Sequence, residues 1–247
     1  MKKPTVLEST DDATIIGRAF GTPLVVKGIT WFPLAELIAW GIMTWVAGLR
    51  HPGWDWRKQI GTGALTSILV LGSEWCHNLA HAGAARLIGK PMDAMRVAWG
   101  MPLVVYYNLN DQNVTPRQHI TRAFGGPLFN AAVLPFILLF RRFTRKGSVA
   151  REVVDTAAGM NLFLCTASLL PIPGIDGGPI LKWSLVDSGY SVAEADDLVK
   201  KADLIVGAGL GAAAGLAMKR RRKLLGALLG MFAALALAVG FGLIKED

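Results

Sequence analysis

The chain has 247 residues, of which 52 % are hydrophobic and 18 % are charged, and its formal net charge is +8. Soluble domains carry about 25 % charged residues. The apolar residues here also gather in long blocks, so the composition argues against a soluble domain and indicates a multi-pass integral membrane protein. The basic residues flank these blocks as membrane flanks do, which argues against a nucleic-acid-binding role. Cys76 and Cys165 fall in apolar segments and are expected to be small buried residues, not a disulfide framework.

The whole chain, 1–247, is expected to form a single integral membrane domain. Its predicted fold is all-α, with about six transmembrane helices and a small membrane-associated β segment. Residues 1 to about 20 are polar and are expected on or near the membrane surface. The β-branched stretch 21–30 predicts a short strand. A first helix is expected at about 29–49, where Glu36 either has a function or faces a partner helix or a water-filled cavity.

The predicted core of this domain covers about 60–178 and begins with a second helix at about 60–89. Strand-like residues at 97–108, interrupted by Gly and Pro, predict a β-hairpin or an extended segment near the membrane surface. A third helix is expected at about 115–140. His119 lies near its start, where an interfacial or packing role is favoured over metal ligation because no other ligand lies at metal spacing.

The rest of the chain predicts further helices on either side of a Pro- and Gly-rich segment. A fourth helix is expected at about 153–170. The C-terminal helices, about 191–244, begin with an amphipathic acidic stretch, 191–203, that predicts a surface helix. Membrane helices at about 204–218 and 224–244 close the chain.

A histidine pair is the strongest functional signal. His77 and His81 are four residues apart in an apolar run long enough to cross a bilayer, so they project from one helix face about one turn apart. That spacing lets both imidazoles reach one metal ion. Glu74 lies three residues before His77 and leans toward the same face. Ionisable residues in membrane helices are costly and usually have a function, so the pattern predicts a metal site.

Asn78 separates this pair from the His-Glu-x-x-His signature of zinc proteases, in which the Glu is the general base. An amide side chain cannot accept a proton from the attacking water. The sequence therefore keeps the two histidines and replaces the usual base.

Asp176 lies in the segment LLPIPGIDGGPI, 169–180, where Pro171 and Pro173 end the fourth helix and several glycines permit a tight turn. Irregular backbone at membrane depth is tolerated only where it is buried in protein or lines a cavity. Asp176 is either a turn-former that bonds its own backbone or a third metal ligand that faces the histidine pair.

Three separated motifs, taken together, resemble the site-2 protease family, the membrane-embedded zinc metalloproteases of the M50 type. The motifs are HNLAH at 77–81, GGPLFN at 125–130 and LLPIPGIDGG at 169–178, which resemble the family's HExxH, GPxxN and NLLPxPxLDGG. The stretches IGRAFGTPLVVKGITWF and RVAWGMPLVVYYN are similar to the family's opening and to its membrane-associated β segment. The resemblance covers about 16–215.

The resemblance implies that His77, His81 and Asp176 bind one zinc ion and that Asn130 lies near the active site. It implies a transmembrane helix of another protein as the substrate, in a lipid bilayer. Two residues depart from the family pattern. Asn78 replaces the catalytic Glu, and Ser168 stands where an Asn would precede LLP.

Three hypotheses follow for the function. In the first, the chain is an intramembrane protease in which Glu74 replaces the missing base. In the second, of equal weight, it is a pseudoprotease that binds zinc and a client membrane helix without cleaving it. A metal-handling or transport protein comes last, because only Glu36 and Glu74 offer further polar positions. The basic loops favour one membrane orientation and the family resemblance the other, so the orientation stays open.

Overall fold

The structure is a computed structural model that describes residues 13–106, 108–172 and 174–243. The start of the predicted polar N-terminal segment, and Pro173 of the predicted irregular turn, lie outside the described residues. The chain divides into two compact units. Unit 1 contains the described residues up to 109 together with 124–167, and unit 2 contains 110–123 and the described residues from 168 onward. That the chain forms a single domain stays a prediction.

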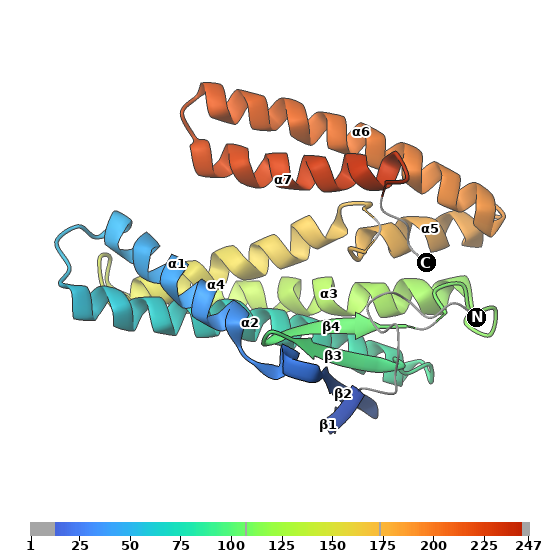
Figure 1. Cartoon of the computed structure of the whole chain (residues 1–247), viewed down its shortest axis with the longest axis horizontal. Coiled ribbons are helices and arrows are strands. Elements are labelled where there is room, and N and C mark those ends of the chain that lie inside the picture. Colours follow the sequence, from blue (N-terminus) through green and yellow to red (C-terminus); the bar gives the residue numbers. More distant parts are fainter. Residues whose placement is uncertain (1–12, 107, 173, 244–247) are drawn as a thin grey trace. The chain divides into compact units, whose positions relative to one another are not determined.

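Unit 1 begins with a small sheet whose strands follow the order β1-β2-β3-β4 (Figure 1). β1 (Ala13–Ala19) pairs antiparallel with β2 (Thr22–Lys27), and β2 runs parallel to β3 (Ala94–Ala98). β3 pairs antiparallel with β4 (Met101–Val105). The predicted strand at 21–30 and the predicted β-hairpin at 97–108 are therefore confirmed. The fold is mostly helical but not all-α, because β1 extends the sheet into the segment expected to be only polar surface.

Both hairpins of this sheet turn through two residues with positive φ. Phe20 and Gly21 have φ of 50° and 84°, and Trp99 and Gly100 have 57° and 92°. Two such residues match the twist of the flanking strands, which is why short hairpins use them. The indole nitrogen of Trp75 donates to the carbonyl of Gly100 at 2.9 Å. The second turn is therefore tied to the helix that carries the histidine pair.

Four helices contribute to unit 1. They are α1 (Leu34–Arg50), α2 (Trp56–Leu87), the part of α3 (Pro116–Arg141) that follows residue 123, and α4 (Val149–Thr166). A short 3₁₀ turn, η2 (Gly28–Trp31), leads from β2 toward α1. Gly63 of α2 faces the backbone of Thr44 so closely that any Cβ would collide with it. Glycine therefore lets α1 and α2 approach backbone to backbone.

Unit 2 contains the first turns of α3 and the elements that follow α4 in the chain. They are η3 (Ala167–Leu169), α5 (Gly177–Asp187), α6 (Val192–Lys219) and α7 (Lys223–Gly240). α5 was not predicted. The predicted surface helix at 191–203 and membrane helix at 204–218 are wrong as separate elements, because α6 runs through both without a break.

α6 and α7 pack closely through small residues. A Cβ on Gly207 would come within 2.7 Å of Leu237, and a Cβ on Gly240 would come within 2.7 Å of Leu204. Small residues at such positions let the backbones of two helices approach each other closely.

Three of the described helices are long and apolar enough to cross a membrane: α3, α6 and α7. The predicted number of about six crossings therefore stays unconfirmed. Large apolar side chains are exposed along helices of both units, among them Trp45, Ile68 and Phe136 in unit 1 and Ile205 in unit 2. Apolar surface of this extent is typical of proteins that contact lipid or another protein. The prediction that both cysteines are buried is wrong, since Cys76 of α2 is exposed and Cys165 of α4 is partly exposed.

Candidate metal centre

The histidine pair lies in the second half of α2. This helix starts at the N-cap residue Asp55, whose carboxylate accepts hydrogen bonds from the amides of Arg57 and Lys58. The helix then continues for 32 residues without interruption. His77 and His81 project from consecutive turns and are both buried. Their Nε2 atoms lie 3.1 Å apart, so the helical spacing brings the two ring nitrogens to one point.

This separation fits zinc. Zinc binds imidazole nitrogen at about 2.0–2.1 Å, and two ligands at a tetrahedral angle are then about 3.3 Å apart. The two Nε2 atoms at 3.1 Å match that value closely. The imidazole planes are inclined by 79° to each other, so the rings approach edge to face and are not stacked.

Asn130 of α3 sets the tautomer of His77. Its Oδ1 accepts from Nδ1 of His77 at 2.6 Å, and its own amide donates to Oδ1 of Asn161 at 2.8 Å. The proton of His77 therefore lies on Nδ1, and the lone pair of Nε2 points toward His81. Such an outer hydrogen bond on a ligating imidazole fixes the orientation of the ring and raises its basicity.

Asn161 of α4 supports Asn130 in turn. The Asn161 amide donates to the carbonyl of Ala157 at 2.9 Å and to the hydroxyl of Ser73 at 3.2 Å. Asn130 is fully buried, and Asn161 is nearly so. Buried amides are costly unless their hydrogen bonds are made, and here one amide satisfies the other. The network therefore joins α2, α3 and α4 behind His77.

Gly126 of α3 leaves the space in front of both rings. A Cβ on this residue would come closer than 3.0 Å to the Nε2 atoms of both His77 and His81. A Cβ on the neighbouring Gly125 would come within 2.8 Å of the carbonyl of Ala80 and within 2.9 Å of the Cα of His81 in α2. Two glycines in succession thus bring α3 against α2 and keep the space beside the two nitrogens open. Both the tetrahedral spacing and this space fit a metal ion.

The backbone amide of Gly126 also contacts His81, with its N–H directed at Nδ1 at 3.3 Å. The proton of a neutral His81 then lies on Nε2 and points at Nε2 of His77. A neutral imidazole that binds a metal through Nε2 carries its proton on Nδ1. Metal binding at His81 would therefore need the other tautomer, and the amide contact of Gly126 with Nδ1 would be lost.

Glu74 and Asn78 lie one turn apart on α2. The Asn78 amide donates to the backbone carbonyl of Glu74 at 3.0 Å and contacts its carboxylate Oε1 at 3.4 Å. The structure thus brings the Glu74 carboxylate against the side chain that occupies the position of the missing base.

Asp176 belongs to unit 2, whereas the histidine pair belongs to unit 1. It occupies the N-cap position of α5 in a helical conformation and makes no capping hydrogen bond through its side chain. Gly177 follows it, and a Cβ there would collide with the carbonyls of Leu169 and Leu170. The assignment of Asp176 as a metal ligand stays a prediction, as do the ligand roles of both histidines.

His119 has the packing environment that its sequence context favoured. Its ring stacks on Trp183 of α5, with centroids 3.8 Å apart and planes inclined by 2°. Nδ1 accepts from the guanidinium of Arg122 at 2.7 Å. His119, Arg122 and Trp183 are all buried within unit 2. The ring is thus held between an aromatic face and a cation.

Three residues of this centre, Gly126, Asn161 and Ser73, had no role assigned from the sequence, although Gly126 lies in the GGPLFN motif. A signal for Gly126 was present, because two glycines followed by a proline inside a helix weaken it and need a packing reason. Asn161 also carried a weak signal as an amide within an apolar helix. Ser73 had none, since a serine can bond the backbone of its own helix.

Comparison with known proteins agrees with this architecture. No family model matches the chain. The chain is 26 % identical over 137 residues to the protein named "Putative zinc metalloprotease MJ0611" of Methanocaldococcus jannaschii, a match that covers 49 % of this chain and 71 % of that protein. Its fold is similar to the solved structure of a site-2 protease from Methanocaldococcus jannaschii. The TM-score is 0.55 at 15 % identity, over 90 % of this chain and 94 % of that one.

The fold and the histidine pair first define a class: a mostly helical protein with a potential metal centre enclosed by its own helices. The relationship in sequence and the shared fold then confirm the resemblance to the site-2 protease family that the three motifs indicate.

Proposed function

We propose that the chain is a multi-pass membrane protein that hydrolyses peptide bonds within transmembrane helices of other proteins, using one zinc ion. The observation that carries this proposal is the pair of Nε2 atoms 3.1 Å apart in front of Gly126. The relative named as a zinc metalloprotease and the site-2 protease fold support it. The three apolar helices support a membrane location, and six crossings stay the prediction.

The proposed ligands are His77, His81 and Asp176, with water in the remaining position of a catalytic site. When bound, zinc lowers the pKa of a water molecule and polarises a scissile carbonyl. Asn130 holds the ring of His77 in the tautomer that presents Nε2. Burial of both histidines excludes bulk water from the centre.

The proposed general base is Glu74. A hydrolytic zinc site needs a carboxylate that takes a proton from the attacking water, and Asn78 cannot do so. The contact between the Asn78 amide and the Glu74 carboxylate supports this role, because it holds a carboxylate beside the position of the usual base. In this proposal Asn78 is a positioning residue.

The substrate is proposed to be a membrane helix. Its backbone amides are bonded within the helix, so a segment must unwind before a carbonyl can react. Pro or Gly near the scissile bond would make unwinding easier. A client helix that is bound and not cleaved would define the second candidate, a pseudoprotease, and Asn78 is the observation that favours it.

One cleavage assay separates these functions. Purified wild type, Glu74→Gln and Asn78→Glu are incubated with a panel of model transmembrane substrates, and zinc content is measured in parallel. We expect wild type to cleave, and Glu74→Gln to lose about 10²–10⁴-fold in rate while it keeps its zinc. Asp197→Asn on α6 is the matched control for a carboxylate removed elsewhere, because Asp197 is exposed and pairs only with the exposed Lys201 among the ion pairs of the described residues, and its rate should equal that of wild type.

Each other outcome contradicts a defined part of the proposal. Cleavage that survives Glu74→Gln would show that the base lies elsewhere. An inert wild type together with an active Asn78→Glu variant would show a pseudoprotease with an otherwise complete site. Loss of zinc in Asp176→Ala is expected, and full retention would remove that residue from the ligand set.

A further inference from the structure

An open cavity lies within unit 1, where α3 ends and α4 begins. It has a volume of about 790 Å³ and is lined by residues of the last turns of α3, the connecting turn and the start of α4. Its apolar wall consists of Pro135, Leu138 and Leu139. Both leucines are exposed. The cavity thus combines an open mouth with apolar surface along one helix.

The remaining wall of the cavity is cationic. Arg141, Arg142, Lys146 and Arg151 line it, and no acidic residue does. Thr144 is the one neutral polar residue of the lining. An apolar wall next to four cations is the arrangement expected for a ligand with an anionic head and an apolar tail.

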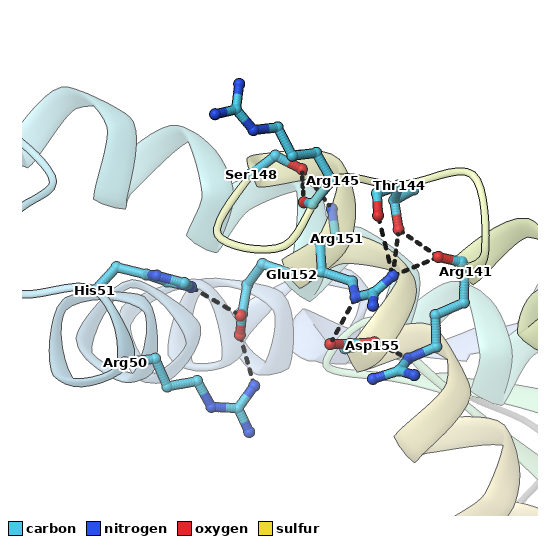
Figure 2. Close-up of polar contacts among 9 residues, drawn as sticks. All are labelled: Arg50, His51, Arg141, Thr144, Arg145, Ser148, Arg151, Glu152 and Asp155. Atoms are coloured by element: carbon cyan, nitrogen blue, oxygen red, sulfur yellow. Dashed lines mark hydrogen bonds and ion pairs between the residues drawn. The ribbon is translucent and has the colours of Figure 1, made fainter.

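Two of these cations are already engaged. Arg141 and Arg151 both bind the carboxylate of Asp155, at 2.5 Å and 3.6 Å. Figure 2 shows Arg151 lying among the Thr144 oxygens, the Arg141 carbonyl and Asp155. Arg151 is also the less exposed of the two, with 14 % of its side chain accessible. The charges of these two residues are therefore partly neutralised by Asp155.

The other two cations carry charge that nothing nearby neutralises. Among the residues that the structure describes, neither Arg142 nor Lys146 forms an ion pair or a side-chain hydrogen bond. The nearby carboxylate of Glu152 is bound to Arg50 and His51 and does not compensate them. The part of the cavity lining formed by Arg142 and Lys146 therefore keeps an excess of positive charge.

The position of the cavity at the end of α3 indicates which class of ligand it would meet. α3 is long and apolar enough to cross a membrane, and the cavity lies at its end, where a membrane-spanning helix meets the headgroup region. Phe140 and Phe143 are exposed beside it. Basic pockets between helices at this depth suit the headgroups of acidic lipids.

We propose that this cavity binds one anionic phospholipid, with its phosphate between Arg142 and Lys146 and an acyl chain along Leu138 and Leu139. The inference rests on α3 crossing the membrane and is independent of peptidase activity. A free phosphate compound shares the headgroup chemistry but would gain nothing from the apolar wall, so the two sources can be separated.

Native mass spectrometry of the full chain in a neutral detergent tests the proposal. The protein is titrated with dioctanoyl phosphatidylglycerol, dioctanoyl phosphatidylcholine or glycerol 3-phosphate. We expect one tightly bound phosphatidylglycerol, with weaker binding of phosphatidylcholine and of glycerol 3-phosphate. The double variant Arg142→Gln/Lys146→Gln should weaken phosphatidylglycerol binding on the order of 30-fold, since each cation near a membrane surface contributes about 1 kcal/mol.

Two further variants keep the result interpretable. Arg220→Gln/Lys223→Gln removes the same charge from exposed positions at the junction of α6 and α7, and it should bind as wild type does. Arg142→Lys/Lys146→Arg keeps the charge and should retain affinity within about threefold. Unfolding temperatures in detergent verify that every variant is folded.

Three outcomes would overturn the proposal. Equal weakening in the double variant and in the α6–α7 control would mean general surface attraction. Equal affinity for phosphatidylglycerol and phosphatidylcholine would remove the role of the cations. Binding of glycerol 3-phosphate as tight as that of the lipid would identify a soluble phosphate ligand in place of a phospholipid.

Discussion

Two polar networks hold α4 within unit 1, and they use different chemistry. In the second half of the helix, Asn161 bonds Asn130 and Ser73 through neutral amide and hydroxyl groups. In its first turns, Glu152 and Asp155 bind cations from the ends of α1 and α3 and from α4 itself (Figure 2). The first network is buried, whereas the second includes side chains that are about half exposed.

The difference shows what each network can specify. Neutral hydrogen bonds in a buried site depend on direction, so the amide chain fixes one tautomer and one ring orientation. Exposed ion pairs depend weakly on direction and are screened by water and salt. The amide network is therefore suited to a reactive centre, and the charged network to joining helix ends. Four predictions test this contrast.

The largest effect is expected at Gly126. In Gly126→Ala the new methyl group would occupy the space in front of both Nε2 atoms, so zinc binding should fall more than about 100-fold. Zinc content by mass spectrometry measures this. Gly159→Ala on α4 is the control, because a Cβ there meets nothing within 4 Å. Full zinc content in Gly126→Ala would mean that the metal does not lie beside these nitrogens.

The second effect concerns the amide network. Asn130→Ala removes the acceptor that holds the proton of His77 on Nδ1, so zinc affinity should fall about 10–100-fold. Asn161→Ala removes a group one hydrogen bond farther from His77, so it should lower zinc affinity by a smaller factor. Competition with a zinc chelator measures both. Asn113→Ala in an exposed turn serves as the control, and equal losses in all three variants would contradict a directional role.

The third effect concerns stability at Glu152. Glu152→Gln weakens the bonds from Arg50 and His51, at 2.6 and 3.0 Å. Arg50 is 55 % exposed and stays hydrated, so the loss should be limited to about 1–2 kcal/mol. Thermal unfolding in detergent should move down by a few degrees, with unchanged zinc content. Lost zinc in this variant would mean that the two networks are coupled.

The smallest effect is expected at Asp155. Its partner Arg141 is 46 % exposed, and ion pairs of this exposure contribute less than about 1 kcal/mol. Asp155→Asn should leave thermal unfolding and zinc content nearly unchanged. The measurement is the same unfolding curve at low and high salt. A drop in unfolding temperature as large as that of Glu152→Gln would show that the Asp155 ion pair is less exposed to solvent than the structure indicates.

The sequence predicted what depends on local pattern and missed what depends on packing. The spacing of His77 and His81 needs only helix geometry, and the structure brings their nitrogens together as expected. The hairpin at Trp99–Gly100 likewise follows from local preferences. β1 was missed because its residues do not alternate between apolar and polar side chains, and two of its isoleucines, Ile15 and Ile16, are exposed. Gly126 and Asn161 act through neighbours far apart in sequence, and periodicity carries no such information.

α6 gives a second example of what local sequence patterns cannot predict, because here they predicted a boundary that does not exist. Acidic residues at 191–203 and apolar residues at 204–218 differ in composition and predict two elements, yet one helix spans both. A capping box at Ser191 and Glu194 starts the helix, and no comparable signal ends it before Lys219. A change in composition along a helix marks a change in surroundings, not a break in the backbone.

The paired glycines of α3 also bear on the order in which the centre matures. Gly125 and Gly126 each cost about 1 kcal/mol of helix propensity, and Pro127 next to them costs about 3 kcal/mol. This stretch is thus a poor helix former by itself, and its packing against α2 compensates for that cost. A chain in which α3 is not packed on α2 would lack both the cover of the two imidazoles and the Asn130 amide that orients His77. A complete metal centre therefore requires that these helices are assembled first.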